Sequence, residues 1–97
     1  MIEEIEKYAK EHKVPIMLKD GIEYLCKYIE ENQVKNILEI GTAIGYSAIK
    51  MALVRDDIHI TTIERDEERY HIAKENIKNM HLENRINLIL GDALEAG

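Results

Sequence analysis

Ninety-seven residues allow one small domain and exclude a multidomain protein. Apolar residues make up 45% of the chain and charged residues 33%, a balance typical of a soluble globular protein. The net charge of −6 argues against tight binding of nucleic acid by this chain alone, and no apolar run approaches the roughly 18 residues of a membrane span. A single cysteine and the lack of a secretory signal favour a cytoplasmic location.

Two helices are expected in the first 33 residues. Apolar positions at three- and four-residue spacing predict the first helix, and they are Ile2, Ile5, Ala9 and His12. Pro15 ends this helix, because the residue before a proline is pushed out of the helical conformation. A second apolar stripe runs from Ile22 to about Asn32 and predicts the next helix.

After residue 34 the pattern alternates between short apolar runs and helical segments. Strands are expected at 34–40, 58–64 and 85–90, and helices at 46–54 and 66–78. The first strand is expected to be buried on both faces, as in a parallel sheet, since its run is mostly apolar and glycine follows it. The sequence therefore predicts an α/β domain over 1–97, with helices at 1–33 and a βαβαβ unit with right-handed crossovers at 34–97.

The turns that follow the three predicted strands are the candidate ligand site, because open α/β sheets bind ligands at the carboxyl ends of their strands. In the first turn, Gly41 and Gly45 let the backbone pass close to a ligand. The helix that begins near Tyr46 aims free N–H groups at that ligand and favours a carboxylate or phosphate. Ser47 adds a hydroxyl donor in its first turn.

Acidic residues close the other two turns. Glu64 ends the second strand 23 residues after Gly41, near the spacing at which a carboxylate accepts both ribose hydroxyls. Asp92 follows the third strand and is placed to accept from an adenine amino group. Together the turns predict a pocket for an adenosine compound with a charged tail.

Alternative explanations stand beside this prediction. Glu64 taken alone is equally well explained as a solvated strand-end acid, Asp92 as a helix cap, and Ser47 as a small packing residue. A dinucleotide site is disfavoured, because Ala43 occupies the middle glycine position of the G-x-G-x-x-G fingerprint. The histidines and Cys26 lack the spacing of metal ligands, so no metal site is expected in this chain.

Three motifs resemble those of class I S-adenosylmethionine-dependent methyltransferases. Residues 39–47 (EIGTAIGYS), followed by AIKMA, resemble the first motif, and the Gly-Tyr-Ser form is similar to the catechol and caffeoyl-coenzyme A O-methyltransferase branch. Residues 62–66 (TIERD) and 91–93 (GDA) resemble the second and third motifs. Upstream, residues 14–17 (VPIM) and 21–25 (GIEYL) are similar to bacterial tRNA 5-hydroxyuridine methyltransferases.

The resemblance implies a Rossmann-like methyltransferase half-fold that binds S-adenosylmethionine or S-adenosylhomocysteine. Residues implied to contact this cofactor are Met17, Glu39, Gly41, Ser47, Glu64, Asp92 and Ala93. Glu64 would hold the ribose, and Asp92 with Ala93 the adenine. Gly41 and Ser47 would face the methionine part, with Glu39 near its amino group and Met17 approaching from the N-terminal segment.

Family members are longer than this chain, and the resemblance places their metal ligands and acceptor site beyond Gly97. The chain is therefore expected to be the N-terminal part of an enzyme, with no catalytic or metal-binding residue of its own. Magnesium is expected in the full-length parent alone. The implied acceptor of that parent is the 5-hydroxyl of a tRNA wobble uridine, with a small catechol-like phenol as the alternative.

Two further expectations concern the chain as it stands. The strand at 36–40 is central in the family's sheet, so its open apolar edge predicts a homodimer, formed either edge to edge through that strand or by exchange of segments. A hypothesis of another class is an isolated or engineered half-domain without catalysis, whose role is structural or limited to weak nucleoside binding.

Overall fold

The computed structural model of the protein describes residues 2–12 and 19–92. Its elements in chain order are α1 (Ile2–Glu11), α2 (Lys19–Glu31), β1 (Asn36–Ile40), α3 (Tyr46–Ala52), β2 (His59–Glu64), α4 (Glu67–Asn79) and β3 (Ile86–Leu90). This order confirms the α/β prediction of two helices followed by three strands with helical crossovers. Each strand starts one or two residues later than expected, and α3 ends two residues earlier.

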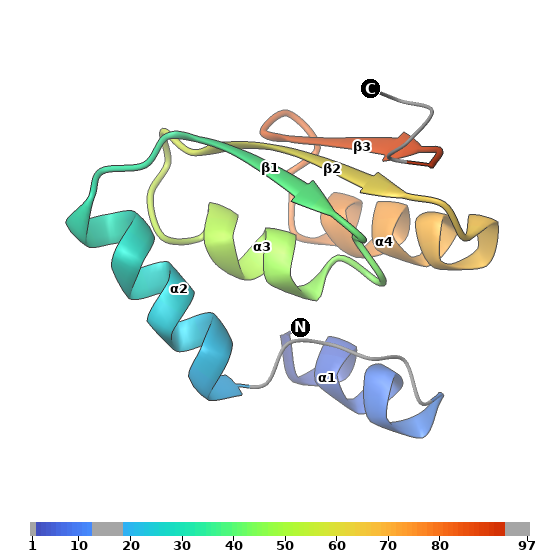
Figure 1. Ribbon diagram of the computed structural model, residues 1–97. Coiled ribbons are helices and arrows are strands. Elements are labelled where there is room, and N and C mark those ends of the chain that lie inside the picture. The colour runs from blue at the N-terminus through green and yellow to red at the C-terminus, as the bar shows by residue number, and fades with distance from the viewer. Residues whose placement is uncertain (1, 13–18, 93–97) are drawn as a thin grey trace.

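The three strands form one parallel sheet in the order β1-β2-β3. The register pairs Ile40 with Ile63 and Ile63 with Ile89, so the carboxyl ends of all three strands meet at one edge. Helices α3 and α4 lie on the same face of the sheet, and no described helix covers the opposite face (Figure 1). This arrangement follows from two right-handed crossovers that step across the sheet in one direction.

Strand β1 differs from its prediction, because it is not buried on both faces. The side chains of Leu38 and Ile40 are 67% and 59% exposed, whereas Ile37 packs against the core. Alternate side chains of a strand point to opposite faces, so Leu38 and Ile40 lie on the face that no described helix covers. The expectation of two-sided burial was wrong because an apolar run does not reveal what covers each face.

The hydrophobic core lies between the sheet and the helices. Ala48, Ile49 and Ala52 give α3 a fully buried face, and α1 and α2 pack against this helix. His12 was predicted to extend the apolar face of α1, but it is exposed and its ring stacks on Tyr8 with centroids 3.9 Å apart. No helix in the described ranges is long and apolar enough to cross a membrane.

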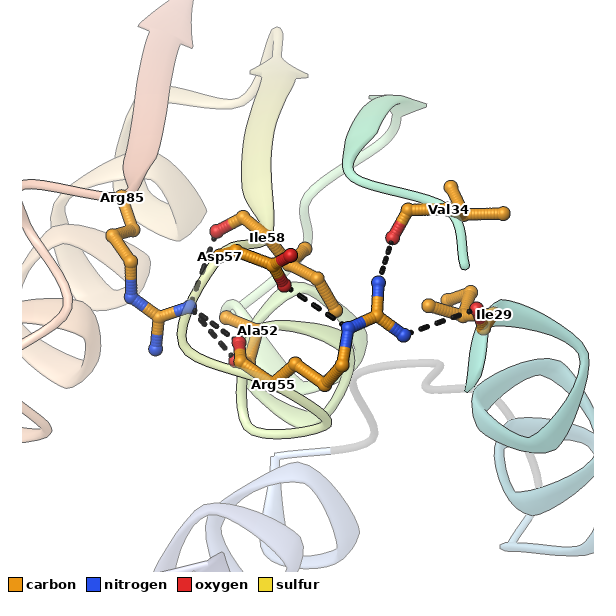
Figure 2. A network of polar contacts seen from close by, with 7 residues as sticks. All are labelled: Ile29, Val34, Ala52, Arg55, Asp57, Ile58 and Arg85. Atoms are coloured by element: carbon orange, nitrogen blue, oxygen red, sulfur yellow. Dashed lines mark hydrogen bonds and ion pairs between the residues drawn. The ribbon is translucent and has the colours of Figure 1, made fainter. Parts of the chain in front are cut away.

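Arg85 closes the amino edge of the sheet, at the start of β3 (Figure 2). Its Nη1 donates to the carbonyl oxygens of Ala52, Arg55 and Ile58 at 3.0, 2.8 and 3.1 Å. These carbonyls belong to the end of α3 and to the loop before β2. A single guanidinium group therefore bonds one carbonyl at the end of α3 and two carbonyls of the loop that follows it.

Arg55 makes a second set of contacts at the same edge (Figure 2). Its Nη2 donates to the Val34 carbonyl at 2.5 Å and its Nη1 to the Ile29 carbonyl at 3.4 Å. Its Nε donates to Asp57 Oδ1 at 3.0 Å. Arg55 thus connects the end of α2 and the segment before β1 to the loop before β2.

Candidate functional site

The turn between β1 and α3 has a left-handed backbone at three positions. Gly41, Ala43 and Gly45 have φ angles of +87°, +53° and +90°. A Cβ at Gly41 would meet no atom within 4 Å, so the glycine is required by its conformation and leaves open space beside the turn. A Cβ at Gly45 would lie 3.6 Å from Ala73 of α4, which shows how closely the turn approaches that helix.

Glu64 connects this turn to the next one. Its side chain is 5% exposed, and Oε1 accepts from the Ala43 N–H at 2.7 Å while Oε2 accepts from the Asp66 N–H at 2.9 Å. An ionised carboxylate offers about four acceptor positions, so two remain after these bonds. Glu64 therefore shapes both turns and keeps the capacity to accept two hydroxyl donors. The partner Ala43 was not predicted, because nothing in the sequence signals its left-handed backbone.

Glu39 lies in a group of hydroxyl side chains beneath the first turn. Its Oε1 accepts from Thr62 Oγ1 at 2.7 Å, and the Ser47 hydroxyl lies close enough to lower the pKa of this carboxyl. Burial raises the pKa of Glu39 above its ordinary value, the hydroxyls of Thr62 and Ser47 oppose the rise, and the nearby Glu64 adds to it. The Ser47 hydroxyl, expected to face a ligand, thus lies near Glu39.

A cavity of about 380 Å³ opens at the carboxyl edge of the sheet, within the size range of small-molecule sites. Its lining residues are Ile40, Gly41, Ala43, Ile63, Glu64, Arg65, Arg69, Gly91 and Asp92. The structure therefore brings together Gly41, Glu64 and Asp92 from three successive turns. Glu39 and Ser47 do not line this cavity, and Met17 and Ala93 lie outside the described residues.

Two arginines at this cavity were not predicted. Arg65 directly follows Glu64, and Arg69 belongs to the first turn of α4, whose N-cap is Asp66. Arg65 could have been predicted from the sequence, since a residue next to a strand-end acid shares its turn. Within residues 2–12 and 19–92, no three histidine, cysteine or acidic side chains are grouped to hold a metal ion.

Comparison with known proteins connects this geometry to a family. The sequence model of the O-methyltransferase family matches residues 1–96. An Arabidopsis thaliana protein assigned as a caffeoyl-CoA O-methyltransferase is 32% identical over 93 residues, which are 95% of this chain and 40% of that protein. The match therefore extends over both N-terminal helices as well as the βαβαβ unit.

Solved structures agree with this match and with the Rossmann-like methyltransferase fold. A Staphylococcus aureus structure assigned as a caffeoyl-CoA O-methyltransferase superposes with a TM-score of 0.94 at 47% identity, covering 97% of this chain and 45% of that one. A Bacillus cereus O-methyltransferase in complex with S-adenosylhomocysteine gives 0.87 at 28% identity, covering 98% and 44%. The chain spans less than half the length of these relatives. By sequence and by fold, the chain belongs to the O-methyltransferase family.

Proposed function

We propose that this chain is the S-adenosylmethionine-binding, N-terminal part of a longer cytoplasmic O-methyltransferase. Residues 1–33 form its N-terminal helices, and residues 34–97 form the βαβαβ half that binds the cofactor. The observation that carries the proposal is the cavity at three strand ends, with a buried carboxylate whose remaining acceptor positions suit a ribose diol. The complex of the Bacillus cereus relative with S-adenosylhomocysteine supports it.

In this proposal the nucleoside occupies the cavity. Glu64 accepts from the two ribose hydroxyls, and Asp92 with Ala93 contacts the adenine. The amino-acid tail extends along the open space beside Gly41 toward Glu39 and Ser47. The Glu39 carboxylate then pairs with the ammonium group of the tail. Met17 approaches from the N-terminal segment.

The acceptor is a property of the longer parent. The upstream motifs favour the 5-hydroxyl of a tRNA wobble uridine, and a small phenol is the second candidate because two relatives are assigned as caffeoyl-CoA O-methyltransferases. Both acceptors present an acidic hydroxyl to the sulfonium methyl. Magnesium is proposed for the longer parent, since the part of the chain that the structure describes holds no group of three histidine, cysteine or acidic side chains suited to a metal ion.

A calorimetric titration with S-adenosylhomocysteine tests the cofactor site. Binding is expected for the unmodified chain and for Glu68→Ala, a control on the exposed face of α4. Glu64→Ala should weaken binding at least about 30-fold, because two hydrogen bonds to a charged acceptor are lost. NAD should not bind. A folded chain that gives no heat with S-adenosylhomocysteine would contradict the proposal and favour a purely structural half-domain.

A second copy of the chain is the proposed partner of the β1 edge. The Lys35 carbonyl accepts from the His59 N–H at 2.7 Å, and the Gly41 N–H donates to the Ile63 carbonyl at 2.8 Å. Because alternate residues of a parallel strand bond to the same neighbour, Asn36, Leu38 and Ile40 direct their backbone groups away from β2. Such an edge is available for pairing with an identical strand about a twofold axis.

A groove of about 510 Å³ beside the same edge adds apolar surface from α2 and β1, including Leu25, Tyr28 and Ile37. Sedimentation of the unmodified chain should show a dimer, and Leu38→Lys should give a monomer. Asn87→Lys is the matched control, because Asn87 is exposed in the same cross-strand row but lies on β3. An unmodified chain that stays monomeric at high concentration would contradict this assignment.

A further inference from the structure

A chain of hydrogen bonds runs through the buried space between β1 and β2. Thr42 Oγ1 and Thr62 Oγ1 are 2.6 Å apart, and Thr62 Oγ1 donates to Glu39 Oε1 at 2.7 Å. Thr62 is 0% exposed and Thr42 1%. A hydroxyl has one proton to donate, and that of Thr62 goes to Glu39, so Thr42 is the donor in the bond between the threonines. The order of donation is therefore Thr42 to Thr62 to Glu39.

The three residues come from three different segments. Glu39 is on β1, Thr42 is in the turn that follows it, and Thr62 is on β2 directly across from Glu39 in the register. The short bonds restrain the position of the Glu39 side chain. Bonds in such a chain polarise one another, so the donation from Thr42 strengthens the one that Glu39 receives.

We infer that Thr62, supported by Thr42, is a positioning residue that holds the Glu39 carboxylate ready for the ammonium group on the amino-acid tail of the cofactor. This inference rests on the proposed function and deepens it. It assigns to the buried threonines the affinity for the tail and leaves the affinity for the nucleoside to Glu64 and the cavity. A purely structural tie between β1 and β2 would instead affect both parts of the ligand equally.

Two ligands separate these roles. S-adenosylhomocysteine carries the amino-acid tail, and 5′-methylthioadenosine has the same nucleoside without it. Thr62→Val should raise the Kd of S-adenosylhomocysteine about tenfold, as expected for one hydrogen bond to a charged group, and that of 5′-methylthioadenosine less than about twofold. Thr62→Ser, which keeps the hydroxyl, should restore tail binding.

The chain offers a matched control and a milder variant. Thr61→Val makes the same substitution one residue away, on the opposite face of β2, and should change neither Kd. Thr42→Val removes the first donor and leaves the second, so it should raise the Kd of S-adenosylhomocysteine about threefold. If Thr62→Val does not fold, Thr42→Val still tests whether the buried threonines support binding of the amino-acid tail.

An equal loss of affinity for both ligands, or no loss for either, would overturn the inference. Failure of the unmodified chain to bind S-adenosylhomocysteine would reject the proposed function and with it the role of Glu39 toward the tail, whereas a ligand-free measurement tests separately whether Thr62 supports the carboxylate. Carbon-detected NMR titration of the Glu39 carboxyl should show a higher pKa in Thr62→Val than in the unmodified chain and in Thr61→Val. An unchanged pKa would show that the bond from Thr62 does not support the carboxylate.

Discussion

The amino ends and the carboxyl ends of the three strands, called here the amino edge and the carboxyl edge, carry polar side chains of opposite charge. At the amino edge, Arg85 and Arg55 donate to backbone carbonyls from four segments, and the loops there are closed against one another. At the carboxyl edge, Glu64 accepts from backbone N–H groups of two turns, yet a cavity of about 380 Å³ remains between them. The polar side chains of the amino edge therefore stabilise the fold, whereas Glu64 at the carboxyl edge retains acceptor positions for a ligand.

This difference follows from the direction of the chain. Helix α3 ends at the amino edge and presents unpaired carbonyls, which attract guanidinium donors. The turns at the carboxyl edge present free N–H groups, which attract carboxylates or an anionic ligand. Substitutions at the two edges should accordingly separate stability from binding.

The largest effect on stability is expected at the amino edge. Arg85→Met keeps the apolar stem but leaves three carbonyls without their donor, so the free energy of unfolding should fall by about 3 kcal/mol. Urea unfolding measures this change. Arg65→Met, at the cavity on the opposite edge, should change stability by less than about 0.5 kcal/mol. Equal losses for both arginine variants would erase the proposed contrast between the edges.

A smaller effect, visible through its pH dependence, is expected from Glu39→Gln. Burial raises the pKa of Glu39 above its ordinary value of 4.5, so the folded state binds this proton more tightly than the unfolded state. The Glu39 contribution to stability is therefore full below pH 4.5 and is lost as the pH rises through the folded-state pKa. The glutamine amide still accepts from Thr62 but does not titrate.

Urea unfolding between pH 4 and pH 8 checks this prediction. The stability of Glu39→Gln relative to the unmodified chain should rise with pH and then level off, while the exposed control Glu83→Gln should show no such trend. A relative stability that falls as the pH rises would mean that the folded state favours the ionised carboxylate instead.

The smallest effect is expected at Ala43, whose φ of +53° is costly for any residue with a Cβ. Ala43→Gly relieves that strain but adds flexibility to the unfolded chain, so a gain of about 0.5 kcal/mol should remain. Ala9→Gly, the same change inside α1, should instead lower stability by about 1 kcal/mol. Thermal unfolding of the two variants gives the comparison, and a loss at both positions would show that the turn is unstrained.

Local patterns predicted those features that depend on neighbouring residues. The alternation after residue 34 predicted the parallel sheet that the structure shows. The turn residues Gly41, Glu64 and Asp92 could be placed together because strand ends of a parallel sheet share an edge.

Contacts between distant segments could not be predicted. The bond between Thr62 and Glu39 depends on the exact register of β1 against β2, and the donation from Arg85 to three carbonyls depends on how α3 ends. The exposure of Leu38 was missed for a different reason, since burial is decided by what covers a face and not by the strand itself.

The sharing of the cavity among three parallel strands also has a kinetic consequence. Each pair of neighbouring strands is joined through a crossover helix, so the cavity is complete only when β3, the last of the described strands, has docked beside β2. A ligand of this cavity then binds the form in which all three described strands are paired, and no form that lacks β3. It would draw the folding equilibrium toward the native state, more strongly as its concentration rises above its Kd, and its binding would report that β3 has docked.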